Sequence, residues 1–401
     1  MQLVAYGAQD VYLTGNPQIT FFKVVYRRHT NFAMESMEQT LNGTSNFGNR
    51  VVCKVSRNGD LLGPCYVETS LPAQNSGELW VNRVGFRLLK QVELRIGGQM
   101  IDRHYSLWMH VWTELTYTSA QKSILGRIIG QKAVDGTLAT EVTQHNLGTD
   151  NGSNSDPFRR LHIPLMFSFC RNPGLALPLI ALQYHEVEIH IEFSSALECS
   201  DDDSTALSGD LSDTSLWCDY MFLDTEERKT FAQNPHEYLI ETVQTQESSV
   251  TASSGNNIRL NFNHPVKELM WVVQQAASAH TGDKFTNFCD ATSTAAGTSS
   301  NVTNAQLKLN GQDRFAQRVN DYFNYVQPYQ HHTGKPDLGI NCYSFALTPE
   351  DHQPSGTCNF SRIDNAELNM TSRVAGTATV MAHGYNVLRV ASGMGGLAYS
   401  N

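Results

Sequence analysis

Two stretches of the sequence decide the fold: "LRIGGQMIDRHYSLWMHVWTEL" at 94–115 and "LKLNGQDRFAQRVNDYFNYVQPY" at 307–329. Both begin with the pattern Leu-Lys/Arg-Leu/Ile-x-Gly-Gln, and an aromatic-rich stretch of helical character follows in each. They start 213 residues apart, from 94 to 307, which is about half of the 401-residue chain. A strand, a glycine turn and a short helix that recur at such an offset predict two copies of one structural unit.

Each unit is predicted to be rich in strands, because apolar and polar residues alternate in several short runs. In "YHEVEIHIEF" (184–193) Val187, Ile189 and Ile191 alternate with acids and a histidine, and "IRLNFNH" (258–264) shows the same period. The run "VVCKVS" (51–56) is followed by Asn58-Gly59, a dipeptide typical of tight hairpins. Many short strands at this spacing indicate sandwiches or barrels.

The composition excludes several classes of function. Charged residues make up 17% of the chain, below the roughly 25% usual for soluble domains, and such a surface suits a strand-rich protein covered by neighbours in an assembly. A formal net charge of -10 argues against non-specific binding to nucleic acid. We find no signal-peptide pattern and no apolar run of about 18 residues, so we expect a soluble chain made in the cytosol.

The motifs of catalysis and cofactor binding are not found in the sequence. It contains no GxxxxGK[ST] loop, HExxH, GxSxG or CxxC. Its eight cysteines are interpreted mostly as reduced, buried side chains. The segment 393–398 matches GxGxxA, but only three residues follow it, which leaves no room for the helix that a dinucleotide site needs. We therefore predict no enzyme, no catalytic residue, no cofactor and no metal.

Three clusters resemble metal or acid sites and are interpreted otherwise. Glu186, Glu188, His190 and Glu192 share one face of a predicted strand. We favour a solvated or subunit-facing surface for them, because no second acidic cluster is identifiable as a partner. The triplet 201–203 (Asp-Asp-Asp) lacks EF-hand spacing and is interpreted as a solvated loop. The adjacent pair 331–332 (His-His) is also assigned to a loop, because neighbouring imidazoles splay apart in most backbones.

Three polar stretches predict long exposed loops, at 135–156, 194–215 and 290–304. Asn151 and Asn301 begin Asn-x-Ser/Thr sequons inside two of them, so these two residues are the candidate positions for glycans. The sequons at Asn42, Asn359 and Asn369 are interpreted as chance matches.

Three longer blocks carry a family resemblance. They are "GAQDVYLTGNPQITFFKVVYRRHTNFA" (7–33), "LWCDYMFLDTEERKTFAQNPHEYLIE" (216–241) and "GYNVLRVASGMGGLAYSN" (384–401). Together these blocks resemble the major capsid proteins of nucleocytoplasmic large DNA viruses, and are most similar to the group that infects algae and other protists. They fall in the family's order and bracket the whole chain.

The resemblance implies an all-β fold of two tandem eight-stranded antiparallel jelly-roll sandwiches, a double jelly roll with short helices in its loops. It divides the chain into an N-terminal arm (1–25), a first jelly roll (26–229) and a second jelly roll (230–401). It implies a homotrimer that forms a pseudo-hexagonal capsomer and tiles an icosahedral virion shell. The expected partners are neighbouring capsomers and minor capsid proteins, with no direct contact to nucleic acid and no insertion into the internal virion membrane. Synthesis and assembly are expected in the host cytoplasm.

The resemblance also assigns roles to the two ends of the chain. The arm is expected to dock on neighbours or minor capsid proteins through a set of polar, aromatic and basic residues. These are Asn16, Phe21, Phe22, Lys23, Arg27 and Arg28. The small residues Gly393, Gly395 and Gly396 are expected to let the C-terminal segment pack closely against the second jelly roll.

One alternative stays open from the sequence. Because the same fold hosts lectins, the chain is also compatible with a tandem jelly-roll carbohydrate-binding protein or glycosidase. Exposed aromatic residues along a concave face would favour that alternative. The aromatic residues lie instead within alternating strands and after the Gly-Gln turns, where packing in the core explains them.

Overall fold

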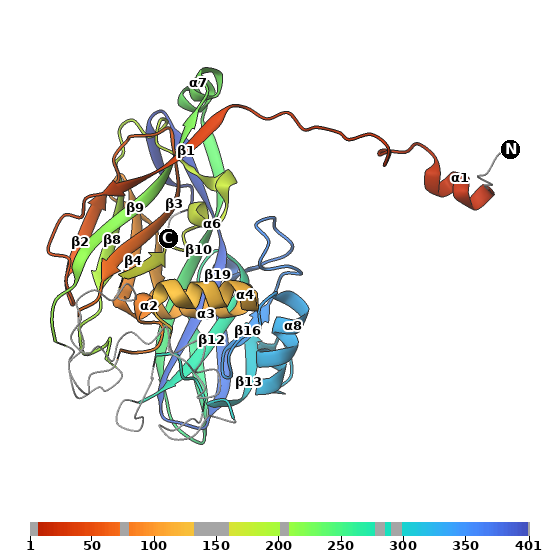
Figure 1. Cartoon of the computed structure of the whole chain (residues 1–401). Helices are drawn as coiled ribbons and strands as arrows, with labels where there is room; N and C mark the ends of the chain where they lie inside the picture. The colour runs from red at the N-terminus through yellow and green to blue at the C-terminus, as the bar shows by residue number, and fades with distance from the viewer. Residues whose placement is uncertain are drawn as a thin grey trace.

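The computed structural model describes residues 7–72, 80–131, 160–200, 208–276, 285–289 and 299–399. Within these residues the strands form four sheets in which every pairing is antiparallel. Two sheets belong to the N-terminal half of the chain and two to the C-terminal half (Figure 1).

The first half forms a sandwich of the sheets β1-β9-β3-β6 and β2-β8-β4-β5, with β7 added beside β3. Its strands are β1 (Phe32–Gln39), β2 (Arg50–Lys54), β3 (Leu61–Ser70), β4 (Leu89–Ile96), β5 (Gln99–Tyr105), β6 (Arg160–Pro164), β7 (Leu177–Pro178), β8 (Val187–Phe193) and β9 (Ser212–Leu223).

The second half repeats this order with β10-β19-β12-β16 and β11-β18-β13-β14. Its strands are β10 (His236–Val250), β11 (Ser254–Leu260), β12 (Pro265–Gln275), β13 (Val302–Leu309), β14 (Gln312–Asp313), β15 (Arg318–Val319), β16 (Asn341–Ser344), β17 (Cys358–Asn359), β18 (Ala366–Ser372), β19 (Gly376–Ala391) and β20 (Met394–Leu397). The first strand of each half pairs with a strand near the end of that half, β1 with β9 and β10 with β19. This shared order confirms the prediction of two tandem jelly rolls.

The repeated Gly-Gln motif lies at the same hairpin of each jelly roll. Gly97 and Gly98 join β4 to β5, whereas Asn310 and Gly311 join β13 to β14. All four residues have positive φ angles, between 51° and 82°, as a two-residue type I′ turn requires at both central positions. Helix α3 (Ser106–Thr116) follows the first hairpin, and η5 (Tyr322–Val326) with α8 (Gln327–His331) follows the second.

One local prediction was wrong. Asn58-Gly59 does not form a hairpin turn, because β2 and β3 belong to different sheets and residues 55–60 cross between them. Gly59 is needed there for close approach, since a Cβ would lie 2.8 Å from Cβ of Tyr220. The charged segment after Asp224 forms helix α7 (Thr225–Gln233), whose first amide donates to the Asp224 carboxylate.

The other helices are α1 (Ala8–Thr14), α2 (Val84–Leu88), α4 (Ser119–Ile129), α6 (Ser168–Arg171), η3 (Pro173–Leu175) and η6 (Phe360–Arg362). Helix α3 lies against the second jelly roll, since its Trp112 contacts His383 of β19 edge to face at 4.6 Å (Figure 1). In the part of the chain that the structure describes, no helix is long and apolar enough to cross a membrane.

The two jelly rolls share one apolar core. The alternating strand residues fill each sandwich as predicted, with Val187, Ile189 and Ile191 at most 2% exposed. The core of the first roll continues into side chains on the outer face of the second, while the interior of the second sandwich forms a separate cluster. The residues that the second roll contributes to the shared core are Ile240, Val243, Met270, Val272, Phe285, Phe288, Ile340, Cys342, Met381, Leu388 and Val390.

Candidate assembly surfaces

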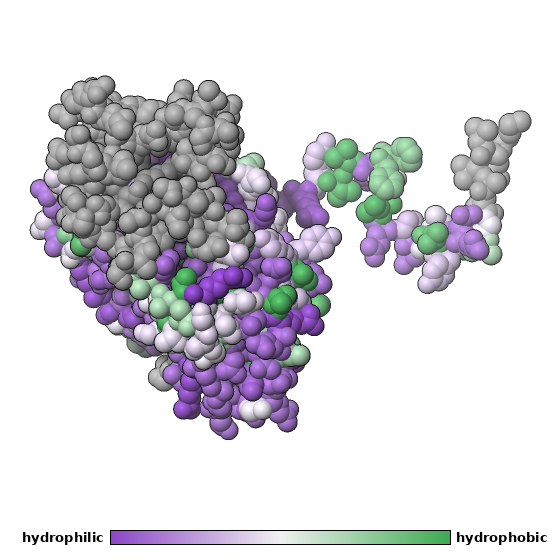
Figure 2. All heavy atoms as spheres, turned by 90° about the horizontal axis from the view of Figure 1, so that it is seen from below, coloured by the Kyte–Doolittle hydropathy of each residue, from purple (hydrophilic) through white to green (hydrophobic). Residues whose placement is uncertain are grey.

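The N-terminal segment at residues 7–31 extends away from both sandwiches (Figure 1). It contains the described part of the predicted arm and the residues that lead from the arm to β1. It consists of helix α1 and an extended segment that leads into β1. Phe21 is 89% exposed and Phe22 98% exposed, and Figure 2 shows apolar residues of the arm standing free of the body. Among the described residues, no hydrogen bond or ion pair joins the arm to a sandwich. A long apolar segment without an intrachain partner is a surface for another molecule.

The polar residues of the arm are also exposed. Lys23, Arg27 and Arg28 are accessible along the extended segment. Asn16 has a φ of 54°, and it follows the residue that ends helix α1. An asparagine tolerates this left-handed conformation better than most residues do, so Asn16 directs the chain away from the helix axis.

The C-terminal segment bridges the two jelly rolls. Its strand β20 pairs with β19 of the second roll, yet its glycines also face the first. A Cβ at Gly393, where φ is +80°, would lie 2.5 Å from the Tyr184 ring, and a Cβ at Gly395 would lie 2.6 Å from Leu182. A Cβ at Gly396 would lie 2.7 Å from a side-chain oxygen of Gln99. These glycines therefore allow contact with the first roll, in addition to the expected packing on the second.

A buried ionic network occupies the junction of the two rolls. At its centre the Glu241 carboxylate of β10 accepts a hydrogen bond from Lys267 Nζ of β12 at 2.6 Å. Its other oxygen lies 2.9 Å from Nη2 of Arg171, which belongs to α6 of the first roll, and 3.3 Å from Nε2 of His383. Burial would raise the pKa of Glu241, but the neighbouring His352, His383 and Arg171 hold it well below its usual value.

The network continues through a second carboxylate. Glu268 accepts a hydrogen bond from Nδ1 of His383 at 3.0 Å, and its other oxygen lies 3.0 Å from Nε2 of His332. The Nδ1 atom of His332 lies 3.1 Å from Glu350. Because both ring nitrogens face carboxylates, His332 is an imidazolium. Burial would lower its pKa, but the charge of Glu268 and the hydrogen bonds that His332 donates to its neighbours raise it to about 12.

The structure does not place the three clusters that resembled metal or acid sites in similar surroundings. In the described part of the chain, no group of three or more histidine, cysteine or carboxylate side chains is placed to hold a metal ion. His331 is the last residue of helix α8 and contacts the Leu347 carbonyl, so the assignment of the pair to a loop was wrong for His331. His332 follows the helix, and its side chain is fully buried. The triplet 201–203 lies outside the described residues.

The acidic face of β8 is paired with bases on neighbouring strands. Lys54 of β2 lies 2.8 Å from Glu186. Glu188 lies 2.9 Å from His190 of the same strand, and Glu192 lies 3.1 Å from Lys90. Each acid therefore has a counter-charge or hydrogen-bond donor, as expected of a structural sheet surface.

Beside this face, Glu93 is buried among Arg50, Arg95 and Arg103 at 2.7 to 2.9 Å. Burial would raise the pKa of Glu93, but the Arg95 hydrogen bond and the charges of the three arginines hold it below its usual value. An ionised carboxylate held by three cations is a structural cross-link between strands rather than a general acid.

The glycan prediction fails at one residue. Asn301 is fully buried, and its side-chain amide donates to the Val273 carbonyl at 2.9 Å. Its backbone amide also donates to Phe288, and its carbonyl accepts from Arg373. The polar composition of 290–304 predicted an exposed loop at Asn301. The polar groups of Asn301 are instead satisfied by backbone groups inside the fold. Asn151 lies outside the described residues.

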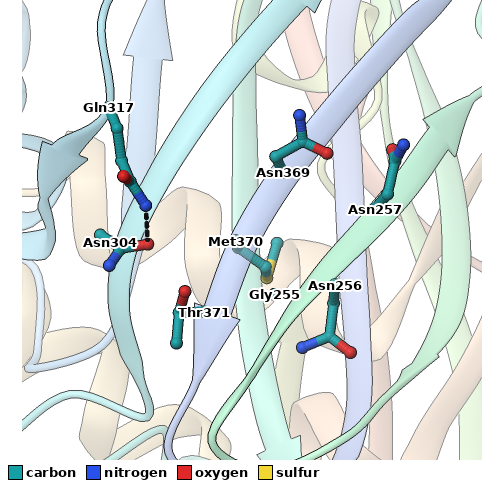
Figure 3. Close-up of a pocket in the computed structure, with 8 residues that line it drawn as sticks. All are labelled: Gly255, Asn256, Asn257, Asn304, Gln317, Asn369, Met370 and Thr371. Atoms are coloured by element: carbon teal, nitrogen blue, oxygen red, sulfur yellow. Dashed lines mark hydrogen bonds between the residues drawn. The ribbon is translucent and has the colours of Figure 1, made fainter.

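A small pocket of about 200 Å³ lies on the sheet formed by β11, β18 and β13 (Figure 3). Glycine, amide, hydroxyl and thioether residues line it: Gly255, Asn256, Asn257, Asn304, Gln317, Asn369, Met370 and Thr371. Gln317 donates to the Asn304 side chain at 2.7 Å. The lining contains no aromatic ring for stacking on a sugar and no carboxylate for glycoside hydrolysis, so it does not favour the carbohydrate-active alternative.

The fold and these surfaces define a class of protein: a structural double jelly-roll subunit. Comparison with known families agrees. Residues 20–224 match the family described as major capsid protein N-terminus, and residues 227–396 match the large eukaryotic DNA virus major capsid protein. The chain belongs to this family of major capsid proteins.

Individual relatives cover the entire chain. The major capsid protein of Pyramimonas orientalis virus is 49% identical over 100% of this chain and 99% of its own length. That of Phaeocystis pouchetii virus is 44% identical with the same coverage. The crystal structure of PBCV-1 VP54, fitted into a reconstruction of the virophage Sputnik, is 39% identical with a TM-score of 0.81 over 95% of this chain and 100% of that one. The protein is a structural, non-enzymatic capsid subunit of the virion.

Sequence reasoning missed the ionic network. One signal was available: Lys267 and Glu268 interrupt the otherwise apolar run "VKELMWVV" (266–273). Charged residues in a strand that is apolar on both faces indicate buried charges with partners elsewhere in the fold, since unpaired charges are almost never fully buried. The partners Arg171 and His383 lie about 100 residues away on either side, so no local pattern identifies them.

Proposed function

We propose that three copies of this chain form a pseudo-hexagonal capsomer, and that such capsomers tile an icosahedral shell. The observation that carries the proposal is the tandem arrangement of two sandwiches with the same strand order in one chain. Three chains around a threefold axis then present six similar sandwiches, which approximates sixfold symmetry.

We further propose that the arm docks on neighbouring subunits and on minor capsid proteins. Residues 1–31 contain three basic side chains and one acidic side chain, a formal charge of +2. Because the whole chain has a formal charge of -10, the remaining residues carry -12. Opposite charges steer the arm toward the body of another subunit. The exposed Phe21 and Phe22 supply apolar area for the contact.

We also propose the division into an arm (1–25), a first roll (26–229) and a second roll (230–401). The supporting observations are the exposed helix α7, which spans the proposed boundary, and the two family matches, which meet between residues 224 and 227. Limited proteolysis that yields fragments ending near residues 25 and 229 would support these boundaries. We place synthesis and assembly in the host cytoplasm, where minor capsid proteins would be encountered.

The testing experiment is light scattering on a sizing column. A particle of three times the 44.6 kDa chain mass is expected at micromolar concentration. A monomer at every concentration, with the fold intact by circular dichroism, would contradict the trimer. Electron microscopy of the same fractions would then show whether the particles have a hexagonal outline.

A further inference from the structure

The junction between the jelly rolls combines two kinds of contact with different consequences. The shared apolar core holds the rolls together, but apolar contacts are non-directional and tolerate sliding. The ionic contacts are more specific, because each joins one cation to one carboxylate. Such contacts can therefore fix the relative orientation of the rolls.

Arg171 is the cation that the first roll contributes to the network around Glu241. Its guanidinium lies 2.9 Å from Glu241 and stacks over the ring of Trp112, 4.9 Å from its centroid. A planar cation held between a carboxylate and an aromatic face has a single favourable position. The guanidinium therefore relates α3 and α6 of the first roll to β10 of the second.

The other groups around Glu241 belong to the second roll. Lys267 donates from β12, His383 faces the carboxylate from β19, and His352 lies 3.8 Å away in a loop. Tyr385 of β19 lies under the Lys267 ammonium, 5.0 Å from it. With Lys267 in place, Glu241 stays paired when Arg171 is removed, so the contribution of Arg171 is orientation more than charge neutralisation.

We propose that Arg171 is a positioning residue that locks the second jelly roll in one orientation against the first, through Glu241 and the Trp112 ring. The inference concerns the isolated chain and does not depend on capsomer assembly. With the lock intact, the two rolls behave as one rigid body. Without it, the junction opens locally while each sandwich remains folded.

Two backbone amides report on this opening, because each donates a hydrogen bond across the junction. The Val243 amide of β10 donates to the Asp102 carboxylate of β5 at 3.2 Å. The Gly334 amide donates to the Leu115 carbonyl of α3 at 2.8 Å. Amides in β3 and β18 lie in central strands and report on the integrity of each sandwich. Opening of the junction exposes the amides of Val243 and Gly334 but not those of β3 and β18.

The experiment is hydrogen exchange by mass spectrometry on the full chain and on Arg171→Met. We expect peptides containing Val243 and Gly334 to exchange at least about 10-fold faster in the variant, with β3 and β18 unchanged. The matched control is Arg228→Met, which removes another arginine ion pair, 2.9 Å from Asp60, on helix α7 and outside the network around Glu241. This control should leave both reporter amides unchanged.

Two results would overturn the proposal. One is unchanged exchange at both reporter amides in Arg171→Met. The other is a uniform rise across all strands, which would show that Arg171 only adds global stability. If Arg171→Met fails to fold, Arg171→Lys keeps the charge but removes the planar stack. It should give a smaller, still selective rise at the same two amides, and a profile like that of the wild type would likewise refute the lock.

Discussion

At the scale of single residues, the junction is specified by a few side chains and one glycine. His332 and Glu268 form the inner end of the ionic network, and their charges depend on each other. Gly334 lets the second roll approach helix α3 so closely that a Cβ would lie 2.5 Å from the Leu115 carbonyl oxygen. The sequence does not reveal these roles, because each of the three residues acts through a partner distant in the chain.

Gly334→Ala should destabilise the protein. The added methyl group cannot fit beside the backbone of α3, so the two rolls must separate slightly and the Gly334 amide loses its bond to Leu115. We expect the free energy of unfolding to fall by about 1–3 kcal/mol in chemical denaturation. Gly255→Ala is the control, since a Cβ there meets nothing within 4 Å. An equal effect at the two positions would contradict this account.

The stabilising effect of His332 should depend on pH. In an unfolded chain the pKa of a histidine is about 6.5. In the folded state burial would lower the pKa of His332, but the charge of Glu268 outweighs burial and the pKa is raised to about 12. The stabilisation is therefore complete below about pH 6.5 and declines as the pH rises toward 12. The pKa of Glu268 is lowered, despite burial, chiefly by His332, so its stabilisation is lost on acidification below about pH 4.3.

Thermal unfolding of His332→Gln and of the wild type, compared between pH 5 and 10, tests this dependence. The difference in stability should be largest near pH 5 to 6 and should shrink steadily toward pH 10. His331→Gln is the matched control, because that ring contacts only the Leu347 carbonyl. A difference that stays constant over this range would show that the ion pairs of His332 do not contribute as argued.

At the scale of elements, the arm and the sandwiches are energetically separate. Helix α1 and the extended segment bury no residue against the body, whereas the strands bury alternate side chains throughout. Changes in the arm should therefore alter association without altering folding.

The double variant Phe21→Ser/Phe22→Ser should keep the unfolding midpoint of the wild type and lose higher assembly, as should deletion of residues 1–25. Both rings are almost fully exposed in the free chain, so their removal costs no intrachain contact. Calorimetry and electron microscopy of assembled material measure the two outcomes. Normal shells built from the variant would show that the arm is dispensable.

Lys23→Ser/Arg27→Ser provides a comparison within the same arm. If the charges act by steering, this variant should associate more slowly at low salt and approach the wild-type rate at high salt, where exposed charges are screened. The phenylalanine variant should remain defective at both salt concentrations, because apolar contact is not screened. Identical salt responses would argue against separate roles for the two kinds of residue.

At the scale of the whole molecule, we expect the two rolls to unfold as one cooperative unit. The core that spans the junction contains side chains from both halves, including Trp108 and Val111 from the first and Met270 and Met381 from the second. Because unfolding of either roll would expose this shared apolar surface, we expect a single transition. Two independent sandwiches joined by a linker would unfold separately.

Scanning calorimetry of the purified protein near pH 6 should therefore give one transition, with the calorimetric enthalpy equal to the van't Hoff enthalpy for each folding unit. Arg171→Met should broaden or split that transition, since it weakens the orientation-specific part of the junction. Two separate transitions in the wild type would contradict the single unit, even if both rolls keep their jelly-roll folds.

The sequence by itself determined the class of fold and its duplication. Alternation in 184–193 specified inward Val187 and Ile189, and the repeated Gly-Gln hairpins marked equivalent turns in both rolls. These features are local: a strand exposes its side chains alternately, and a type I′ turn needs two residues that accept positive φ.

The tertiary structure alone decided which polar residues are buried and what they contact. Asn301 reads as a loop residue in sequence but satisfies backbone groups inside the fold, and the His331-His332 pair divides between the surface and the core. Arg171, Glu241 and His383 converge from positions up to 212 residues apart. A charge can be buried only where its partners are already placed, and the folding of both jelly rolls, rather than any local pattern, places them.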